Sequence, residues 1–130
     1  MLIETADKSG FCFGVQRAID ITEQAADRYS EVFTLGPLIH NRIVTDSLEK
    51  RGVHIAADVR DAQGKPLVIR SHGVGRDTEE RAQAACSVLL DATCPFVKRI
   101  HKIVSEQPAD STVVILGDGE HPEVQGIMGH

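Results

Sequence analysis

Six residues that could bind a metal, bind an anion or move a proton stand near predicted helix starts. They are two cysteines, three histidines and a glutamate: Cys12, His40, His72, Cys94, His121 and Glu123. At a helix start, free backbone N–H groups and the positive end of the helix dipole stabilise a thiolate or attract a phosphate. These residue types in this pattern predict a site that holds a metal, an anion or both.

The other thiol and imidazoles have simpler interpretations. Cys86 lies inside a predicted helix, so we interpret it as core packing. His54 and His101 fall within a predicted strand and a predicted helix, and we interpret both as structural or solvated. Cys12 and Cys94 could also be buried small residues, although each lies beside Gly or Pro at a predicted loop-to-helix junction. Residue types and spacing alone leave zinc and iron–sulfur chemistry open.

Alternating strand and helix patterns must position these residues. The spacing of apolar residues predicts helices over 15–29, 40–51, 77–85 and 95–106, and another from Pro122. Short apolar runs predict strands over 2–6, 32–35, 53–56, 67–70, 88–91 and 112–116. Nearly continuous apolar strands are typical of a mainly parallel sheet flanked by helices, which is an α/β fold. Ligand sites form where the carboxyl ends of such strands meet, so we expect the candidate residues to gather at that edge.

The composition is that of an ordinary globular protein with one compact core. Of its 130 residues, 42% are hydrophobic and 25% charged, and the formal net charge of −5 argues against a general nucleic-acid binder. No apolar run is long enough for a membrane span, and the start lacks the pattern of a secretory signal. With three cysteines and no export signal, we expect the reducing cytoplasm and no disulfide framework. The glycine fingerprints of nucleotide-binding domains are absent.

Five short motifs, in order along the chain, resemble those of the 4-hydroxy-3-methylbut-2-enyl diphosphate reductase family. The motifs are Gly10-Phe11-Cys12-Phe13-Gly14-Val15-Gln16-Arg17-Ala18-Ile19, Gly36-Pro37-Leu38-Ile39-His40-Asn41, Arg70-Ser71-His72-Gly73-Val74, Asp91-Ala92-Thr93-Cys94-Pro95-Phe96-Val97 and His121-Pro122-Glu123-Val124-Gln125-Gly126. Members of this family catalyse the last step of non-mevalonate isoprenoid biosynthesis. The resemblance implies an oxidoreductase that converts the allylic diphosphate to isopentenyl and dimethylallyl diphosphate.

The resemblance also implies a cofactor and an electron donor. Family members carry a 4Fe-4S cluster held by three cysteines, and Cys12 and Cys94 match the first two. The third family cysteine lies beyond residue 130, and Cys86 matches no family motif. A ferredoxin or a flavodoxin is the electron donor that the resemblance implies.

By the same resemblance, the remaining candidates contact the substrate. His40, His72 and His121 match the imidazoles that hold the diphosphate or relay protons, and Glu123 matches the proton donor. The implied enzyme has three α/β lobes. Residues 1–12 would form an opening strand and cluster loop that pairs with the third lobe, residues 13–94 the first lobe, and residues 95–130 the start of the second. The alternative is an isolated α/β domain that binds zinc or no metal and has no activity.

Overall fold

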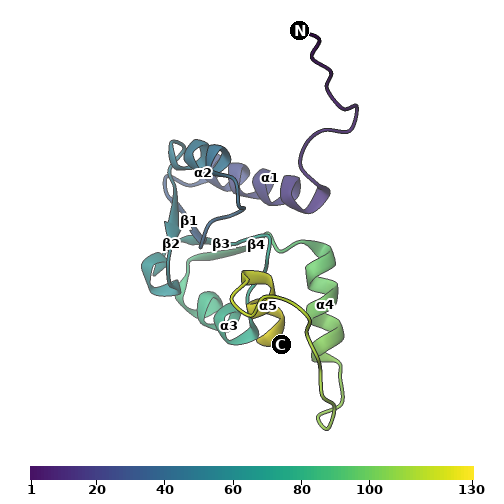
Figure 1. Ribbon diagram of the computed structural model, residues 1–130. Helices are drawn as coiled ribbons and strands as arrows, with labels where there is room; N and C mark the ends of the chain where they lie inside the picture. The colour runs from purple at the N-terminus through teal and green to yellow at the C-terminus, as the bar shows by residue number, and fades with distance from the viewer.

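The computed structural model describes all 130 residues as short strands and helices in alternation (Figure 1). The helices are α1 (Phe13–Arg28), α2 (Arg42–Glu49), the 3-10 helix η1 (Val59–Ala62), α3 (Arg76–Ala85), α4 (Pro95–Ser105) and α5 (Pro122–Met128). The strands are β1 (Val32–Leu35), β2 (Val53–Ala56), β3 (Pro66–Ile69) and β4 (Val88–Asp91). No helix is long and apolar enough to cross a membrane.

The four strands form one parallel sheet in the order β2-β1-β3-β4. Helices α1 and α2 lie on one face of this sheet and α3 on the other, while α4 and α5 lie beyond the carboxyl end of β4 (Figure 1). A parallel sheet needs crossover connections that cover both of its faces, and the fully buried pattern of β3 shows that both are covered. The α/β fold predicted from the sequence is therefore confirmed.

Alternation along the strands divides the core into two clusters. Val32 and Val68 pack with Ala18 of α1 and Leu48 of α2 on one face. On the other face Leu67 packs in a second cluster with residues of η1 and α3, which include Val59 and Ala82. Successive strand residues point to opposite faces, so apolar side chains at consecutive positions serve both clusters.

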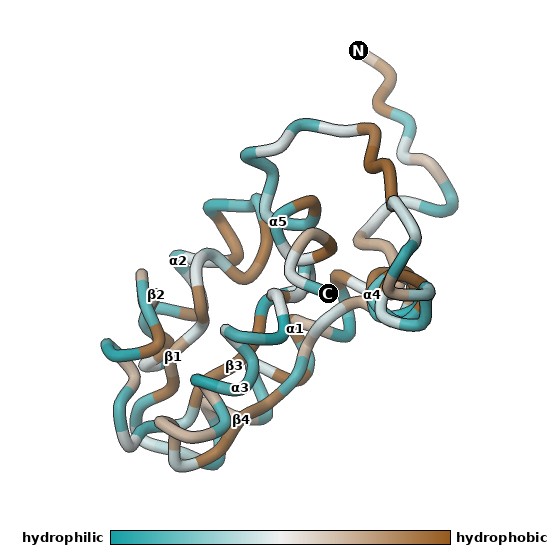
Figure 2. Tube along the Cα trace, turned by 90° about the horizontal axis from the view of Figure 1, so that it is seen from below, coloured by the Kyte–Doolittle hydropathy of each residue, from teal (hydrophilic) through white to brown (hydrophobic).

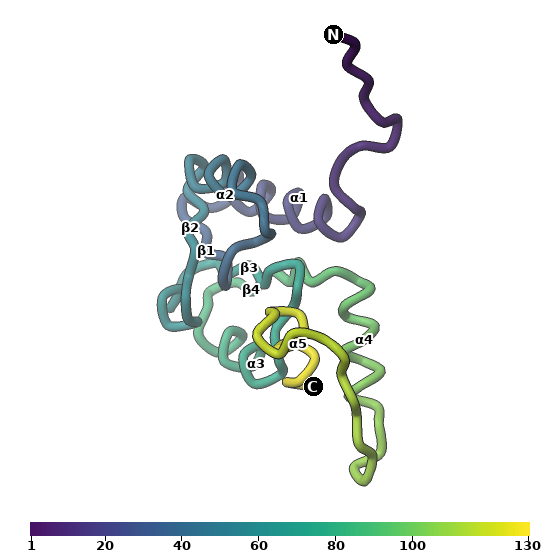
Figure 3. Tube along the Cα trace, viewed as in Figure 1, coloured from purple at the N-terminus to yellow at the C-terminus, as the bar shows by residue number.

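Two predicted strands are wrong, because neither 2–6 nor 112–116 is a strand in the structure. Their apolar side chains are exposed: Leu2 is 85% exposed and Leu116 is 96% exposed. Figure 2 shows the hydrophobic stretch in the connection between α4 and α5, and Figure 3 follows that connection along the chain. A strand forms only where a neighbouring strand offers backbone hydrogen bonds. An apolar run in the sequence does not show whether such a neighbour is present. The predicted lobe boundaries and the pairing of residues 1–12 stay predictions.

The start of the second helix also differs from the prediction over 40–51. Asn41 is the N-cap of α2, and its side-chain oxygen accepts a hydrogen bond from the Val44 backbone N–H at 3.2 Å. Asparagine favours this role because its amide oxygen satisfies an N–H group that has no partner within the helix. His40 is consequently left in the loop before the helix, where its ring is exposed.

Strand β3, one of the two inner strands of the sheet, allows a test of this packing. Ile69→Ala should lower the free energy of unfolding by about 2–5 kcal/mol, because the side chain is almost fully buried in β3 and its loss leaves a cavity. Ile55→Ala is the matched control, since Ile55 of β2 is 56% exposed and its loss should cost under ~1 kcal/mol. Urea denaturation followed by circular dichroism measures both; equal losses would contradict the assignment of the core.

Candidate active site

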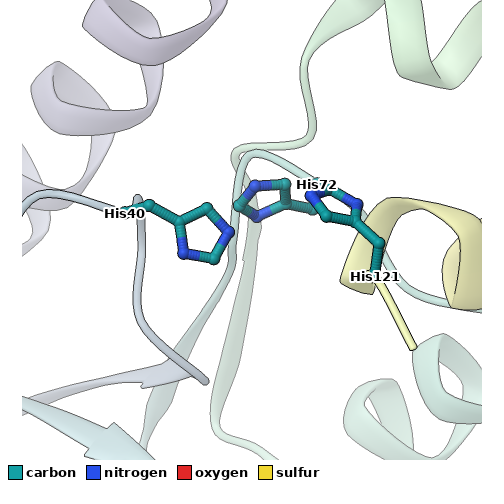
Figure 4. Close-up of side chains that lie close together, drawn as sticks. All are labelled: His40, His72 and His121. Atoms are coloured by element: carbon teal, nitrogen blue, oxygen red, sulfur yellow. The ribbon is translucent and has the colours of Figure 1, made fainter. Parts of the chain in front are cut away.

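Three imidazoles from distant parts of the chain meet at the carboxyl edge of the sheet (Figure 4). His40 follows β1, His72 follows β3 and His121 precedes α5. The ring centroids of His40 and His72 are 4.8 Å apart, those of His72 and His121 5.6 Å, and those of His40 and His121 6.0 Å. One ring nitrogen from each lies within 4.8 Å of the other two. The structure thus brings together the three histidines that the sequence singles out.

Ser71 connects the segments that carry these residues. Its hydroxyl and its backbone N–H both donate to the carbonyl of Leu38, at 3.2 and 3.5 Å, which holds the loop of His40 against the loop of His72. The Ser71 carbonyl accepts from the Cys94 N–H at 2.9 Å. Ser71 is only 7% exposed, so water does not compete strongly for these bonds. Sequence reasoning assigned no role to Ser71; the available signal was its place in the motif beside His72.

His121 has a second function at the start of α5. Its Nδ1 accepts a hydrogen bond from the Glu123 backbone N–H at 3.2 Å, while Pro122 occupies the first helical position. Nδ1 therefore carries no proton in this arrangement, and Nε2 is the nitrogen that carries one. Glu123 lies half-buried in the first turn of α5. The group of mutually close ligand atoms comprises the three imidazoles, and Glu123 and the cysteines lie outside it.

The electrostatics of the cluster favour an anion. The pKa of His72 is lowered to about 4, first by burial and then by the positive charges of His40, Arg70 and His121. The buried Nδ1 of His72 has no hydrogen-bond partner. Burial disfavours the charged imidazole, and neighbouring cations disfavour it further, so His72 is neutral at pH 7. A bound anion would reverse the second effect and give the ring a partner.

Arg70 supplies a fixed charge behind this cluster and is a second residue to which sequence reasoning gave no role. Its guanidinium packs against Gly36, where an added Cβ would come within 2.5 Å of one of its terminal nitrogens. Gly36 has φ +73°, a conformation that side chains other than glycine rarely adopt. Burial lowers the pKa of Arg70, its Nε has no partner, and it forms no ion pair. A half-buried, uncompensated guanidinium is well suited to an anion.

The two predicted metal ligands lie at two helix starts. Cys12 is the N-cap of α1 and is exposed, and Cys94 is the N-cap of α4, with Pro95 at the first helical position. The first turn of α1 lies against Cys94, since a Cβ added at Gly14 would come within 2.5 Å of the Cys94 Sγ. The absence of a side chain at Gly14 therefore allows the two helix starts to converge.

Arg17 fixes this convergence from α1. Its guanidinium donates to the carbonyls of Thr93 and Asp91, at 3.2 and 3.3 Å, in the segment that leads into Cys94. The Asp91 carboxylate in turn accepts from the Thr93 N–H at 2.9 Å and pairs with Lys98. Burial alone would raise the pKa of Asp91, but these hydrogen bonds lower it, so the carboxylate stays charged and shapes the turn.

These residues fit part of an iron–sulfur site. Both thiols are free, both belong to N-cap residues of helices, and the absence of a side chain at Gly14 leaves room for the Cys94 sulfur. Cysteine thiolates are the usual ligands of such clusters. The third thiol, Cys86, does not lie inside a helix as predicted but is the C-cap of α3, where the chain turns to extended conformation. It packs against the second core cluster, and burial raises its pKa. Cys86 therefore has the surroundings of a packing residue.

Comparison with known proteins identifies relatives of this arrangement. A family model described as LytB protein matches residues 3–130. Proteins named 4-hydroxy-3-methylbut-2-enyl diphosphate reductase from Alkaliphilus oremlandii and Geobacter sulfurreducens are 45% and 44% identical to this chain, over 99% and 100% of its length. The chain covers 47% and 46% of those two proteins, so it spans about half the length of the curated relatives it matches.

Solved structures agree with the sequence comparison. The structure of (E)-4-hydroxy-3-methyl-but-2-enyl diphosphate reductase, the terminal enzyme of the non-mevalonate pathway, matches 95% of this chain and 45% of its own with a TM-score of 0.81 at 37% identity. The corresponding reductase from Plasmodium falciparum gives a TM-score of 0.87 at 29% identity, over 95% of this chain and 40% of its own. The family resemblance of the five motifs is confirmed, and this chain belongs to the LytB protein family.

Proposed function

We propose that this chain is part of a reductase that converts 4-hydroxy-3-methylbut-2-enyl diphosphate to isopentenyl and dimethylallyl diphosphate. The observation that carries the proposal is the group of three imidazoles backed by Arg70 at the same sheet edge as Cys94. Family membership and the names of the relatives support it. Because the chain spans about half of those relatives, we assign the activity to a protein that supplies the remaining residues.

The three histidines and Arg70 would bind the diphosphate. Ring N–H groups and a guanidinium donate hydrogen bonds to phosphate oxygens, and the charge of the phosphate makes these bonds stronger than those between neutral groups. The His72 ring has an unpartnered Nδ1, and His121 directs a protonated Nε2 away from its own helix. The diphosphate would therefore satisfy donors that have no protein partner.

Cys12 and Cys94 would hold two corners of a 4Fe-4S cluster, with the third ligand beyond residue 130. Such a group supplies single electrons and, at an iron without a protein ligand, a Lewis acid. The chain's own contribution is to hold both thiolates at helix starts through Gly14 and Arg17. We take a ferredoxin or a flavodoxin as the electron donor and the cytoplasm as the compartment.

Glu123 would donate a proton in this reaction. Removal of the hydroxyl consumes two electrons and two protons: the C–O bond breaks, the oxygen leaves as water, and the allylic carbon skeleton gains one hydrogen. Hydroxide is a poor leaving group, so a positioned acid is needed. Glu123 is suited by its place in the first turn of α5, two residues from the His121 ring.

A divalent metal is the second candidate ligand of the three imidazoles. Histidine nitrogens are common zinc ligands, and three with an open position form a known type of site. A zinc ion bound to three nitrogens at ~2.1 Å requires the nitrogens to lie closer together than the 4.8 Å limit observed, so the rings would have to move inward. The uncompensated charge of Arg70 favours an anion instead.

Anion binding can be tested with inorganic pyrophosphate and the full-length protein. In the free protein the pKa of His72, followed by the NMR shifts of its ring against pH, should be about 4. Pyrophosphate should raise this pKa because a neighbouring anion favours the charged imidazole. His72→Gln and His121→Gln should each weaken pyrophosphate binding by about tenfold or more, whereas His54→Gln, a change at an exposed ring on β2, should not. Tighter binding of zinc than of pyrophosphate by the same three histidines would favour the metal instead.

Cluster ligation predicts a colour and an iron content. After anaerobic reconstitution, the full-length protein should show broad visible absorbance that falls strongly in Cys12→Ser and Cys94→Ser, because serine is a poor ligand for such iron. Cys86→Ser is the matched control and should keep both iron and sulfide. Unchanged iron and sulfide in the first two variants would refute the ligand assignment, and a colourless protein with bound zinc would favour a zinc site.

Glu123→Gln should lower turnover of the reconstituted enzyme by about 10²-fold or more, because general acid catalysis contributes on that order. Pyrophosphate affinity and iron content should stay near those of the wild type, since the amide keeps the size of the carboxyl. Glu120→Gln, at an exposed site just before His121, controls for the loss of one negative charge. Near-normal turnover of Glu123→Gln would remove this residue as the proton source.

A further inference from the structure

His101 is a buried imidazole to which the proposed mechanism gives no role. It lies in α4 with 6% of its surface exposed, and its Nε2 has no hydrogen-bond partner. Burial lowers its pKa, as does the positive charge of neighbouring His130. Apolar side chains fill most positions of this kind in a protein core, so the presence of an imidazole here needs a physical reason.

The ring of His101 fills a space between two backbone segments that both carry site residues. A Cβ added at Gly73, next to His72, would come within 2.6 Å of the His101 Cε1. A Cβ added at Gly126 of α5 would come within 3.3 Å of the His101 Nε2. Gly126 also faces the His72 carbonyl, at 3.5 Å from the added Cβ. The imidazole therefore touches the turn that carries His72 and helix α5, whose N-cap is His121.

The ring is also held by other groups. The methyl group of Thr93 packs at the same glycine, since a Cβ added at Gly73 would lie 2.9 Å from it. His130 stacks on His101 with ring centroids 4.1 Å apart and an angle of 26° between the planes. The Nε2 of His130 lies 3.1 Å from the Val74 carbonyl, just after the same turn. His101 thus has little freedom to move when either segment presses on it.

We propose that His101 is a positioning residue that sets the spacing between the His72 turn and helix α5. This inference rests on the proposed function, because the spacing matters only if the imidazoles of His72 and His121 bind one diphosphate together. Both contacts are made with glycines, so no intervening side chain can adjust when the His101 ring changes size. Since Cys94 is the N-cap of α4, His101 also ties this spacing to the helix that carries a predicted cluster thiolate.

A double-mutant cycle in the full-length protein tests this role, with pyrophosphate affinity as the readout. Gly126→Ala alone should weaken pyrophosphate binding by about tenfold, because the added methyl presses on the His101 ring and displaces α5 from the His72 turn. His101→Ala alone should also weaken binding, because the spacer is lost. In the His101→Ala background the Gly126→Ala change should cost less than about threefold, since its tightest contact, with the His101 ring, is gone and the distance to the His72 carbonyl is an ordinary van der Waals contact. Effects that simply multiply would overturn the proposal.

Further measurements separate this role from general stability and from the proposed function. His101→Gln, which keeps part of the volume, should restore pyrophosphate affinity above that of His101→Ala even where the two unfold at similar temperatures. His54→Ala removes an exposed imidazole and should leave affinity unchanged. If His72→Gln and His121→Gln leave pyrophosphate binding intact, the proposed function fails. If they abolish binding while every His101 and Gly126 variant binds normally, the positioning role alone fails.

Discussion

The hydrogen bonds of one buried serine join three of the segments that carry the candidate site. Ser71 binds the carbonyl of Leu38 through two donors and receives the N–H of Cys94 at its own carbonyl. Through these bonds the segments after β1, β3 and β4 become one surface, although they are far apart in sequence. Parallel strands deliver their ends to the same edge of the sheet, but they do not fix the loops beyond it. Ser71, which lies between Arg70 and His72, fixes these loops because its hydrogen bonds are shielded from water.

The charge arrangement follows from the same edge. The chain as a whole is acidic, with a formal net charge of −5, but the site gathers three imidazoles and one guanidinium. The ion pairs of the chain do not include Arg70 or the three imidazoles; Arg51, for example, pairs with the carboxylates of Glu23 and Asp27. The Arg70 guanidinium and the ring nitrogens without partners act on a bound ligand at short range, where global charge has little influence. The site can therefore favour an anion in a protein that repels anions overall.

Much of this could be predicted from the sequence, and the exceptions have physical causes. The four strands of the sheet were predictable because each is a short apolar run between helical patterns, and His40 and His72 followed because parallel strands share an edge. His121 joins them although no strand directly precedes it. The strand predicted over 112–116 failed because hydrophobicity does not provide a pairing partner. Ser71, Arg70 and His101 were missed because their importance depends on tertiary neighbours. A serine that ties three segments looks, in sequence, like any loop serine.

The cap that begins α5 connects helix geometry to the protonation state of one ring. The Nδ1 of His121 can accept the Glu123 N–H only while it carries no proton. A proton taken up on that nitrogen would make it a donor, so that the ring N–H of His121 and the backbone N–H of Glu123 would point at each other. The first turn of α5 would then lose its cap at the same moment as the site gained a charge. The Nε2–H can donate a hydrogen bond to a ligand and leave the cap intact, but the ring can take up a further proton only at Nδ1, so the fold couples the charging of His121 to the loss of the cap on the helix that presents Glu123.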